Sequence, residues 1–222
     1  MSQYGKSEYW EERYTRDPEP FDWYQRLTGI KDLLLSQQEP FLTPESAILN
    51  IGCGNSRLSE ELFDEGYQNI YNIDISAVCI KAMQEKYKDK GPNFQYSQMD
   101  VRDMSAFKAG QFDCVIDKGT LDSVLCGDSS TSNVQKMLNE IHRVLTPNGV
   151  YFVVSYGQPE HRLLYLDKLE YDWTVVTQQV NKPTISNTIS LTGDDKDSPN
   201  VHYIYICKKK GQGEQQQQDN QE

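Results

Sequence analysis

Apolar and polar residues alternate along most of the 222-residue chain in a pattern that predicts strands and helices in turn. Short apolar runs predict seven strands, at Ala47–Cys53, Asn69–Ile75, Asn93–Asp100, Phe112–Asp117, Val150–Tyr156, Trp173–Val180 and His202–Cys207. Segments with helical spacing predict helices at Ser56–Glu65, Ala77–Tyr87, Val134–Leu145 and Pro159–Leu169. Strands that alternate with helices favour a mostly parallel sheet with helices on both faces.

The last two predicted strands are separated by a polar insert and not by a helix. We therefore expect these strands to pair antiparallel and the insert, 193-GDDKDSPN-200, to be an exposed loop. Residues 211–222 contain no apolar residue and are predicted to be a disordered, Gln-rich tail. The sequence thus indicates one α/β domain over residues 1–210, with a seven-stranded sheet that ends in an antiparallel C-terminal hairpin.

Composition and charge exclude some classes of function. Hydrophobic residues make up 37% of the chain and charged residues 25%, which is typical of a soluble protein. The net charge of -11 argues against a protein that binds nucleic acid through its phosphates. The same charge suits a basic partner or a lysine-bearing substrate. Solubility alone explains the charge equally well.

Cysteine and histidine positions indicate neither disulfides nor a metal site. The five cysteines include no C-x-x-C pair and the three histidines are scattered, so we expect reduced core thiols and no bound metal. The N-terminus lacks an apolar signal core, and no apolar run approaches the roughly 20 residues that a membrane span needs. A cytoplasmic protein without membrane contact is expected.

Two glycines stand where the first predicted strand passes into a helix, in 47-AILNIGCGNSRLSEEL-62. In open parallel sheets, ligands bind beyond the carboxyl ends of the strands, which is where Gly52 and Gly54 are predicted to lie. Glycine allows the backbone to approach a ligand closely, and it also permits a tight turn. The glycines alone do not decide between these two interpretations.

Acidic residues at the ends of the next two strands favour a nucleoside ligand. Asp74 ends the second strand, where a carboxylate can accept both hydroxyls of a ribose, and Asp100 ends the third, on the side expected for an adenine. A dinucleotide-binding loop has a third glycine beside the pyrophosphate, but Arg57 occupies that position here. S-adenosylmethionine has no pyrophosphate, so this methyl donor is the predicted cofactor.

The motifs ILNIGCGNS, NIDIS, MDV, FDCVIDKGTLDSVL and HRVLTPNGVYFVVS together resemble the seven-β-strand, Rossmann-like (class I) methyltransferases over about residues 45–207. The segments EYWEERY, FDWY and DKGTLDSVL further resemble the eukaryotic protein lysine methyltransferases that modify translation elongation factor 1A. The resemblance implies a protein-lysine N-methyltransferase that uses S-adenosylmethionine and acts on an elongation factor 1A-like protein substrate. A monomer is expected.

The resemblance also implies roles for individual residues. Those implied at the cofactor site are Trp10, Tyr14 and Trp23 as aromatic lining, Gly52 in the glycine loop, Asp74 with Ile75 at the ribose, Asp100 with Val101 at the adenine, and Lys118. The N-terminal segment, residues 1–30, is itself too aromatic for a loose tail. It could form a lid that excludes water from the sulfonium, or it could simply pack on the sheet.

The exit of the fourth strand, 116-IDKGTLDSVLCG-127, is predicted to border the reacting end of the cofactor. Asp117 and Asp122 are the candidates to orient a substrate amine, and Lys118 is the candidate to hold the cofactor. Each has a structural alternative, because an acid can cap a helix and a lysine can lie on the surface. Two other functions stay open: a small-molecule or carboxyl methyltransferase, and a cofactor-binding subunit without catalysis.

Overall fold

The computed structural model describes residues 3–38, 40–183 and 200–211. Within these residues seven strands form one sheet in the order β3-β2-β1-β4-β5-β7-β6. The strands are β1 (Ile48–Ile51), β2 (Ile70–Asp74), β3 (Phe94–Gln98), β4 (Phe112–Lys118), β5 (Leu145–Ser155), β6 (Trp173–Asn181) and β7 (Val201–Lys209). Strands β1 to β5 pair in parallel, and β7 pairs antiparallel with both β5 and β6. The predicted mixed sheet is confirmed.

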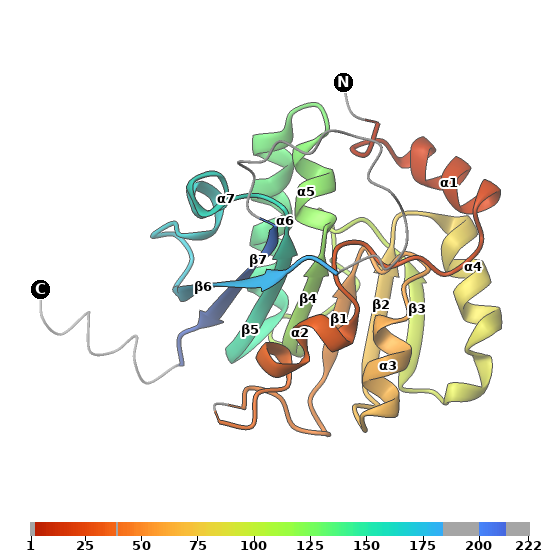
Figure 1. The fold of residues 1–222 in the computed structure, drawn as a ribbon, viewed down its shortest axis with the longest axis horizontal. Helices are drawn as coiled ribbons and strands as arrows, with labels where there is room; N and C mark the ends of the chain where they lie inside the picture. Colours follow the sequence, from red (N-terminus) through yellow and green to blue (C-terminus); the bar gives the residue numbers. More distant parts are fainter. Residues whose placement is uncertain (1–2, 39, 184–199, 212–222) are drawn as a thin grey trace, which may run out of the picture.

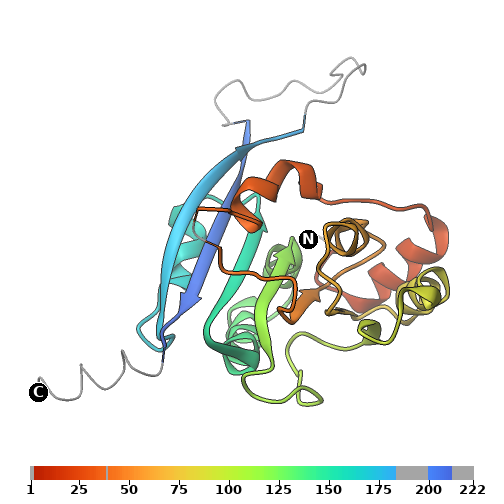
Figure 2. The same cartoon turned by 90° about the horizontal axis from the view of Figure 1, so that it is seen from below.

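Helices cover both faces of the sheet, as Figures 1 and 2 show. They are α1 (Ser7–Arg16), α2 (Leu27–Leu34), α3 (Leu58–Asp64), α4 (Ala77–Lys86), η1 (Lys88–Lys90), α5 (Thr120–Leu125), α6 (Ser130–Val144) and α7 (Pro159–Leu166). One core cluster joins α2, α3 and α4 to one face, and a second joins α5, α6 and α7 to the other. Strand β1 serves both, because Ile48 belongs to the first cluster while Leu49 and Ile51 belong to the second.

Helix α6 illustrates how the apolar pattern fixes an element in place. Its predicted apolar positions are buried against the sheet, with exposed fractions of 0–1% for Val134, Met137, Leu138, Ile141 and Val144. The helix begins at Ser130 and not at Val134 as predicted. Its polar first turn carries no hydrophobic signal, which explains the difference.

Helices α1, α2 and α5 were not predicted as helices. The segment that carries α1 has a mean hydropathy typical of an exposed chain, and of its residues only Tyr14 is buried. The predicted exposed loop at 193–200 and the predicted tail at 211–222 lie outside the described residues, apart from Asn200 and Gly211. Among the helices that the structure describes, none is long and apolar enough to cross a membrane.

Candidate active site

A cavity of about 450 Å³ lies at the carboxyl ends of β1 to β4, between α1 and α5. Its volume falls within the range of about 300–1,000 Å³ that is usual for small-molecule sites. The predicted site residues that line it are Trp10, Tyr14, Trp23, Gly52, Asp74, Ile75, Asp100, Val101, Lys118 and Asp122. Gly54 and Asp117 are not among its lining residues.

The carboxylate of Asp74 is fixed by backbone amides at the end of β2. Its Oδ2 accepts a hydrogen bond from the Gly54 N–H at 2.8 Å, and its Oδ1 accepts one from the Ser76 N–H at 2.9 Å. Burial raises the pKa of Asp74, while these amides oppose the rise. Each carboxylate oxygen retains a lone pair, so Asp74 can accept hydrogen bonds from two neighbouring hydroxyls.

Both glycines of the loop make room for other side chains of the protein. A Cβ on Gly52 would lie 2.1 Å from Thr120 Oγ1, and a Cβ on Gly54 would lie 2.5 Å from Tyr14 Oη. Their φ angles of +55° and +52° also favour glycine. The turn and these close approaches therefore account for both glycines, and Gly54 serves the cavity through its hydrogen bond to Asp74.

Asp100 and Val101 follow the end of β3. They lie on the side of the cavity opposite β4 and the helix α5 that follows β4. The guanidinium of Arg102 donates hydrogen bonds to the Asp100 carboxylate, from Nη2 to Oδ2 at 2.6 Å and from Nε to each oxygen at 3.0 Å. Burial of Asp100 would raise its pKa, but the bonds from Arg102 outweigh burial and lower it. Asp100 thus lines the cavity as a carboxylate with its charge already balanced.

Helix α1 lies beside α4 and forms one wall of the cavity (Figure 1). The Glu11 carboxylate accepts hydrogen bonds from Ser76 Oγ at 2.8 Å, Ala77 N at 2.8 Å and Val78 N at 3.1 Å. It therefore caps the N-terminus of α4 from another helix. On the same helix, Trp10 and Tyr14 stack with ring centroids 5.9 Å apart.

Lys118 binds the segment that follows α1 through Asp22 and Trp23. The ammonium of Lys118 donates to Asp22 Oδ1 and to the Trp23 carbonyl, each at 3.1 Å, and the two charged side chains are 6% and 10% exposed. Burial lowers the pKa of Lys118, and Asp22 counteracts this. Lys118 lines the cavity, and its charge is directed at the N-terminal segment.

Asp117 lies beneath the cavity and is fully buried. It accepts hydrogen bonds from the Thr120 N–H at 2.7 Å, the Leu121 N–H at 3.0 Å and the Tyr151 hydroxyl at 2.7 Å. Burial is the main reason that its pKa is raised to about 7. These contacts cap the first turn of α5, which is the structural alternative that the sequence left open.

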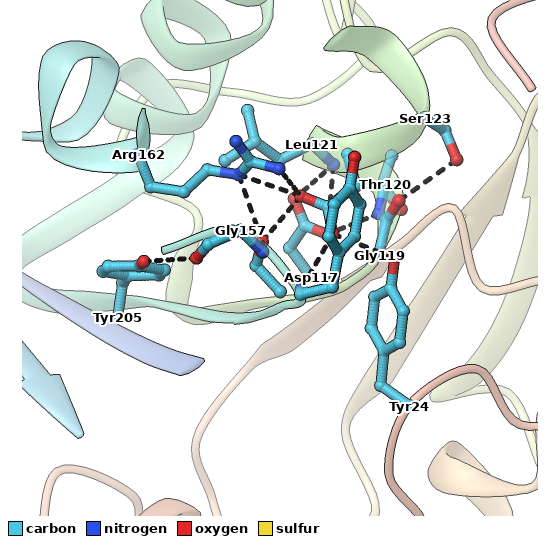
Figure 3. Close-up of polar contacts among 12 residues, drawn as sticks. Tyr24, Asp117, Gly119, Thr120, Leu121, Ser123, Gly157, Arg162 and Tyr205 are labelled. Atoms are coloured by element: carbon cyan, nitrogen blue, oxygen red, sulfur yellow. Dashed lines mark hydrogen bonds and ion pairs between the residues drawn. The ribbon is translucent and has the colours of Figure 1, made fainter. Parts of the chain in front are cut away.

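Asp122 lies in α5 and faces the cavity, with both carboxylate oxygens occupied. Oδ1 accepts from Ser155 Oγ at 2.6 Å and pairs with Arg162 Nη2 at 2.9 Å. Oδ2 accepts from Tyr24 Oη at 2.9 Å and from the Tyr156 N–H at 3.2 Å. In Figure 3, Tyr24 and Arg162 reach this cluster from opposite sides. Asp122 is therefore ion-paired, and its hydrogen bonds hold the surrounding side chains in place.

Comparison with known proteins places the chain in a family. Residues 49–153 match the family model described as a methyltransferase domain. The Mus musculus protein named EEF1A lysine methyltransferase 4 is 37% identical over 183 residues, which cover 78% of this chain and 69% of that protein. The chain belongs to this methyltransferase family. The Homo sapiens eEF1A lysine and N-terminal methyltransferase is 38% identical over 159 residues, 70% of this chain but only 22% of that longer protein.

Solved structures share the fold of this methyltransferase at low sequence identity. A Haloferax volcanii methyltransferase, solved in complex with the Trm112 methyltransferase activator, has a TM-score of 0.65 and 13% identity, covering 94% of this chain and 98% of that one. A Burkholderia thailandensis 1,6-didemethyltoxoflavin N1-methyltransferase with bound S-adenosylhomocysteine has a TM-score of 0.55 and 14% identity, covering 75% and 72%. The protein is an S-adenosylmethionine-dependent methyltransferase.

The lining of the cavity fits this cofactor by its chemistry. Three cations line it, Lys6, Arg102 and Lys118; the last two are paired with Asp100 and Asp22, so these two do not form a site for a pyrophosphate. Asp74 offers a carboxylate for a diol, and aromatic rings suit an adenine and a sulfonium. The cavity thus offers the groups that a nucleoside with a positively charged sulfonium needs: an acceptor for its hydroxyls and aromatic rings for its base and its charge.

Two residues of the site, Tyr156 and Arg162, were not singled out from the sequence, and Tyr24 was considered there only as one of the aromatic residues of the N-terminal segment. Tyr24 and Tyr156 line the cavity, and Arg162 pairs with Asp122 from behind. Tyr156 could have been suspected, because it ends the fifth predicted strand at the edge where the other site residues lie. The pairing of Arg162 with Asp122 joins residues 40 apart and leaves no local signal.

Proposed function

We propose that this methyltransferase modifies a lysine side chain of a protein, and that the protein resembles translation elongation factor 1A. The observation that carries the proposal is the similarity to relatives that are named as elongation factor 1A lysine methyltransferases, at 35–38% identity over most of the chain. The net charge of -11 supports it, because an acidic enzyme attracts a basic partner. A cytoplasmic location follows from a substrate that works in translation.

The shape of the cavity also supports a protein substrate. Tyr156 lines the cavity and is 55% exposed, so the cavity reaches the surface beside α5. A long, unbranched lysine side chain can enter such an opening while the protein that carries it stays outside. A closed pocket would instead suit a small molecule.

We assign the cofactor contacts as follows. Asp74 and Ile75 hold the ribose, Asp100 and Val101 border the adenine, and the aromatic side chains of the lid surround the sulfonium. When bound, S-adenosylmethionine supplies a methyl group that is already activated by its sulfonium. The chain's own task is then to exclude water and to align the substrate amine.

The N-terminal residues and the strand-four exit share this task. In this proposal the N-terminal segment acts as a lid: its residues Trp10, Tyr14 and Trp23 line the cavity, and Lys118 holds the segment through Asp22 and Trp23. Asp122 fixes the side chains at the end of the cavity where the substrate amine would enter. Asp117 supports the start of α5 and does not contact the ligands. We propose that residues 1–210 form this one catalytic domain, which works as a monomer without the tail at 211–222.

The test combines tritiated S-adenosylmethionine with the purified protein and a lysate of its own organism, resolved by electrophoresis. We expect one labelled band of the size of elongation factor 1A, and mass spectrometry of that band should locate the methyl group on a lysine. Asp74→Ala is the control, because it removes the proposed ribose contact. Label confined to small metabolites would overturn the proposal in favour of a small-molecule methyltransferase. Cofactor binding in calorimetry without any transfer would indicate a non-catalytic subunit.

A further inference from the structure

Tyr24 is held in an unusual backbone conformation beside the cavity. Its φ angle is +61°, in the left-handed region that a bulky aromatic residue rarely adopts. Such strain persists only where surrounding contacts impose it, and it is found most often at functional sites. Here both neighbours are clamped: the Trp23 carbonyl accepts from Lys118, and Gln25 Nε2 donates to the Asn181 carbonyl at 2.7 Å.

The side chain of Tyr24 is fixed as firmly as its backbone. A Cβ on Gly119 would lie 3.0 Å from the Tyr24 ring, so the glycine gives the ring its space. The ring centroid lies 5.0 Å from that of His202 and 6.1 Å from that of Tyr156. The hydroxyl donates to Asp122 Oδ2 at 2.9 Å (Figure 3). The hydroxyl is thus set at one position in the cavity wall.

The hydrogen-bonding state of this hydroxyl determines what it can bind. Burial first, and then the Asp122 charge, raise the pKa of Tyr24 far above its usual range, so the phenol keeps its proton at neutral pH. The hydroxyl uses this single proton in its hydrogen bond to Asp122. The phenol oxygen can then only accept hydrogen bonds from a ligand. A ligand group at this place must therefore be a donor, such as the N–H of an amine. A carboxylate, which only accepts, would be left without a partner.

The charge around Tyr24 also favours a neutral amine. Asp122 is paired with Arg162, and the side chains of the two are 4% and 7% exposed. The pair has no net charge, so it does not hold an ammonium as a free carboxylate would. A lysine needs the neutral form, because only the neutral amine has a lone pair for the methyl carbon.

We propose that Tyr24 Oη accepts a hydrogen bond from the target amine and so aims its lone pair, with Tyr156 as the second aromatic wall of the entrance. This inference rests on the proposed lysine substrate, since it requires an amine. The ammonium loses one proton to solvent before the reaction. One N–H then bonds to Tyr24, the nitrogen lone pair forms the new N–C bond, and the electron pair of the broken C–S bond stays with sulfur. The product nitrogen carries the positive charge.

The number of N–H groups on the amine gives this role a signature that a merely structural role lacks. A neutral lysine has two N–H groups and a monomethyl-lysine has one, whereas a dimethyl-lysine has none. Tyr24 can therefore assist the first and second transfers but not the third. Loss of the hydroxyl should slow the first two and leave the third unchanged.

The test compares Tyr24→Phe with the wild-type protein and with Tyr67→Phe, a tyrosine outside the cavity lining. For Tyr24→Phe we expect the first transfer to elongation factor 1A to fall about 10- to 100-fold, from one lost hydrogen bond and looser alignment. Binding of the unmodified protein substrate with S-adenosylhomocysteine present should weaken severalfold. Cofactor affinity in calorimetry should stay unchanged, and Tyr67→Phe should match the wild type throughout.

The outcomes separate this inference from the proposed function. If the wild type methylates lysine and Tyr24→Phe does so at the same rate, the role of Tyr24 is refuted while the proposed function stands. Equal slowing of all three transfers would also refute it, because it would indicate a general structural defect. If the wild type methylates no lysine, the proposed function fails, and the role of Tyr24 fails with it.

Discussion

Glu11→Gln tests whether the docking of α1 on α4 maintains the cofactor site. Glu11 Oε1 accepts from the Ala77 N–H, while Oε2 accepts from Ser76 Oγ and the Val78 N–H. Glutamine keeps one of these oxygens and places an NH₂ group where the other was. At least one N–H at the start of α4 then loses its acceptor, and the negative charge at the helix N-terminus is lost as well.

The size of the effect follows from these contacts. A hydrogen bond to a charged group contributes about 1.5–3 kcal/mol, and a charge at a helix end about 0.3–1 kcal/mol. Glu11 is half-buried, so water replaces part of what is lost and the net effect on α1 docking is about 1–2 kcal/mol. That energy corresponds to a change of about 5- to 30-fold in an equilibrium constant.

Cofactor affinity, measured by calorimetry, should report this change. Helix α1 brings Trp10 and Tyr14 to the cavity, so we expect Glu11→Gln to weaken S-adenosylmethionine binding by up to about 30-fold. Glu12→Gln is the matched control, because Glu12 lies on the same helix, carries the same charge and is exposed. Equal affinity of the two variants would refute the view that the cap holds the lid in place.

The ionisation of Glu11 makes the comparison of Glu11 with glutamine depend on pH only in the acid range. Burial opposes the ionisation of Glu11, but its hydrogen bonds outweigh burial and lower its pKa. A carboxyl with a folded-state pKa below its unfolded one contributes stability that is complete above the unfolded pKa of about 4.3 and is lost as pH falls through the folded value. Measurements at neutral pH therefore compare fully ionised Glu11 with glutamine.

Three further predictions follow from the site. Asp74→Ala should remove most cofactor affinity without unfolding the protein; unchanged affinity in calorimetry would exclude the ribose contact. Deletion of residues 1–24 should weaken both cofactor binding and turnover, and binding that survives intact would contradict the lid. Because burial raises the Asp117 pKa to about 7, folding takes up a proton, and the free energy of unfolding should fall as pH rises from about 4 to 7. Asp117→Asn should flatten this fall, by up to about 1.4 kcal/mol per pH unit in urea titrations, and equal slopes would refute it.

Most of the fold could be predicted because its signals are local. Each strand of the sheet is a short apolar run, and the absence of a helix before β7 predicts the antiparallel hairpin. Helix α1 was not predicted because its aromatic residues Trp10 and Tyr14 line the cavity and form no helical stripe against the sheet. Its stability comes from contacts such as Glu11 with α4, which join residues more than 60 apart.

The site could be predicted only as far as the strand ends. Asp74 and Asp100, which both line the cavity, could be proposed from the sequence because a position near the end of a predicted strand is visible there. The partners of Asp122 were not, since its bond to Tyr24 spans 98 residues and its pairing with Arg162 depends on how α7 packs. A sequence pattern shows that an acid is present. Only the fold shows that its charge is already paired.

Paired charges explain how a protein of net charge -11 can favour a neutral amine. Near the strand-four exit, Lys118 is paired with Asp22 and Arg162 with Asp122, so neither pair brings a net charge to this end of the cavity. At the other end, backbone amides hold Asp74, and its carboxyl oxygens can still accept hydrogen bonds from a ligand. A free carboxylate beside the target lysine would stabilise the ammonium, which has no lone pair for transfer. The contacts that occupy both carboxylate oxygens of Asp122 therefore suit this end of the cavity to the methylation of an amine.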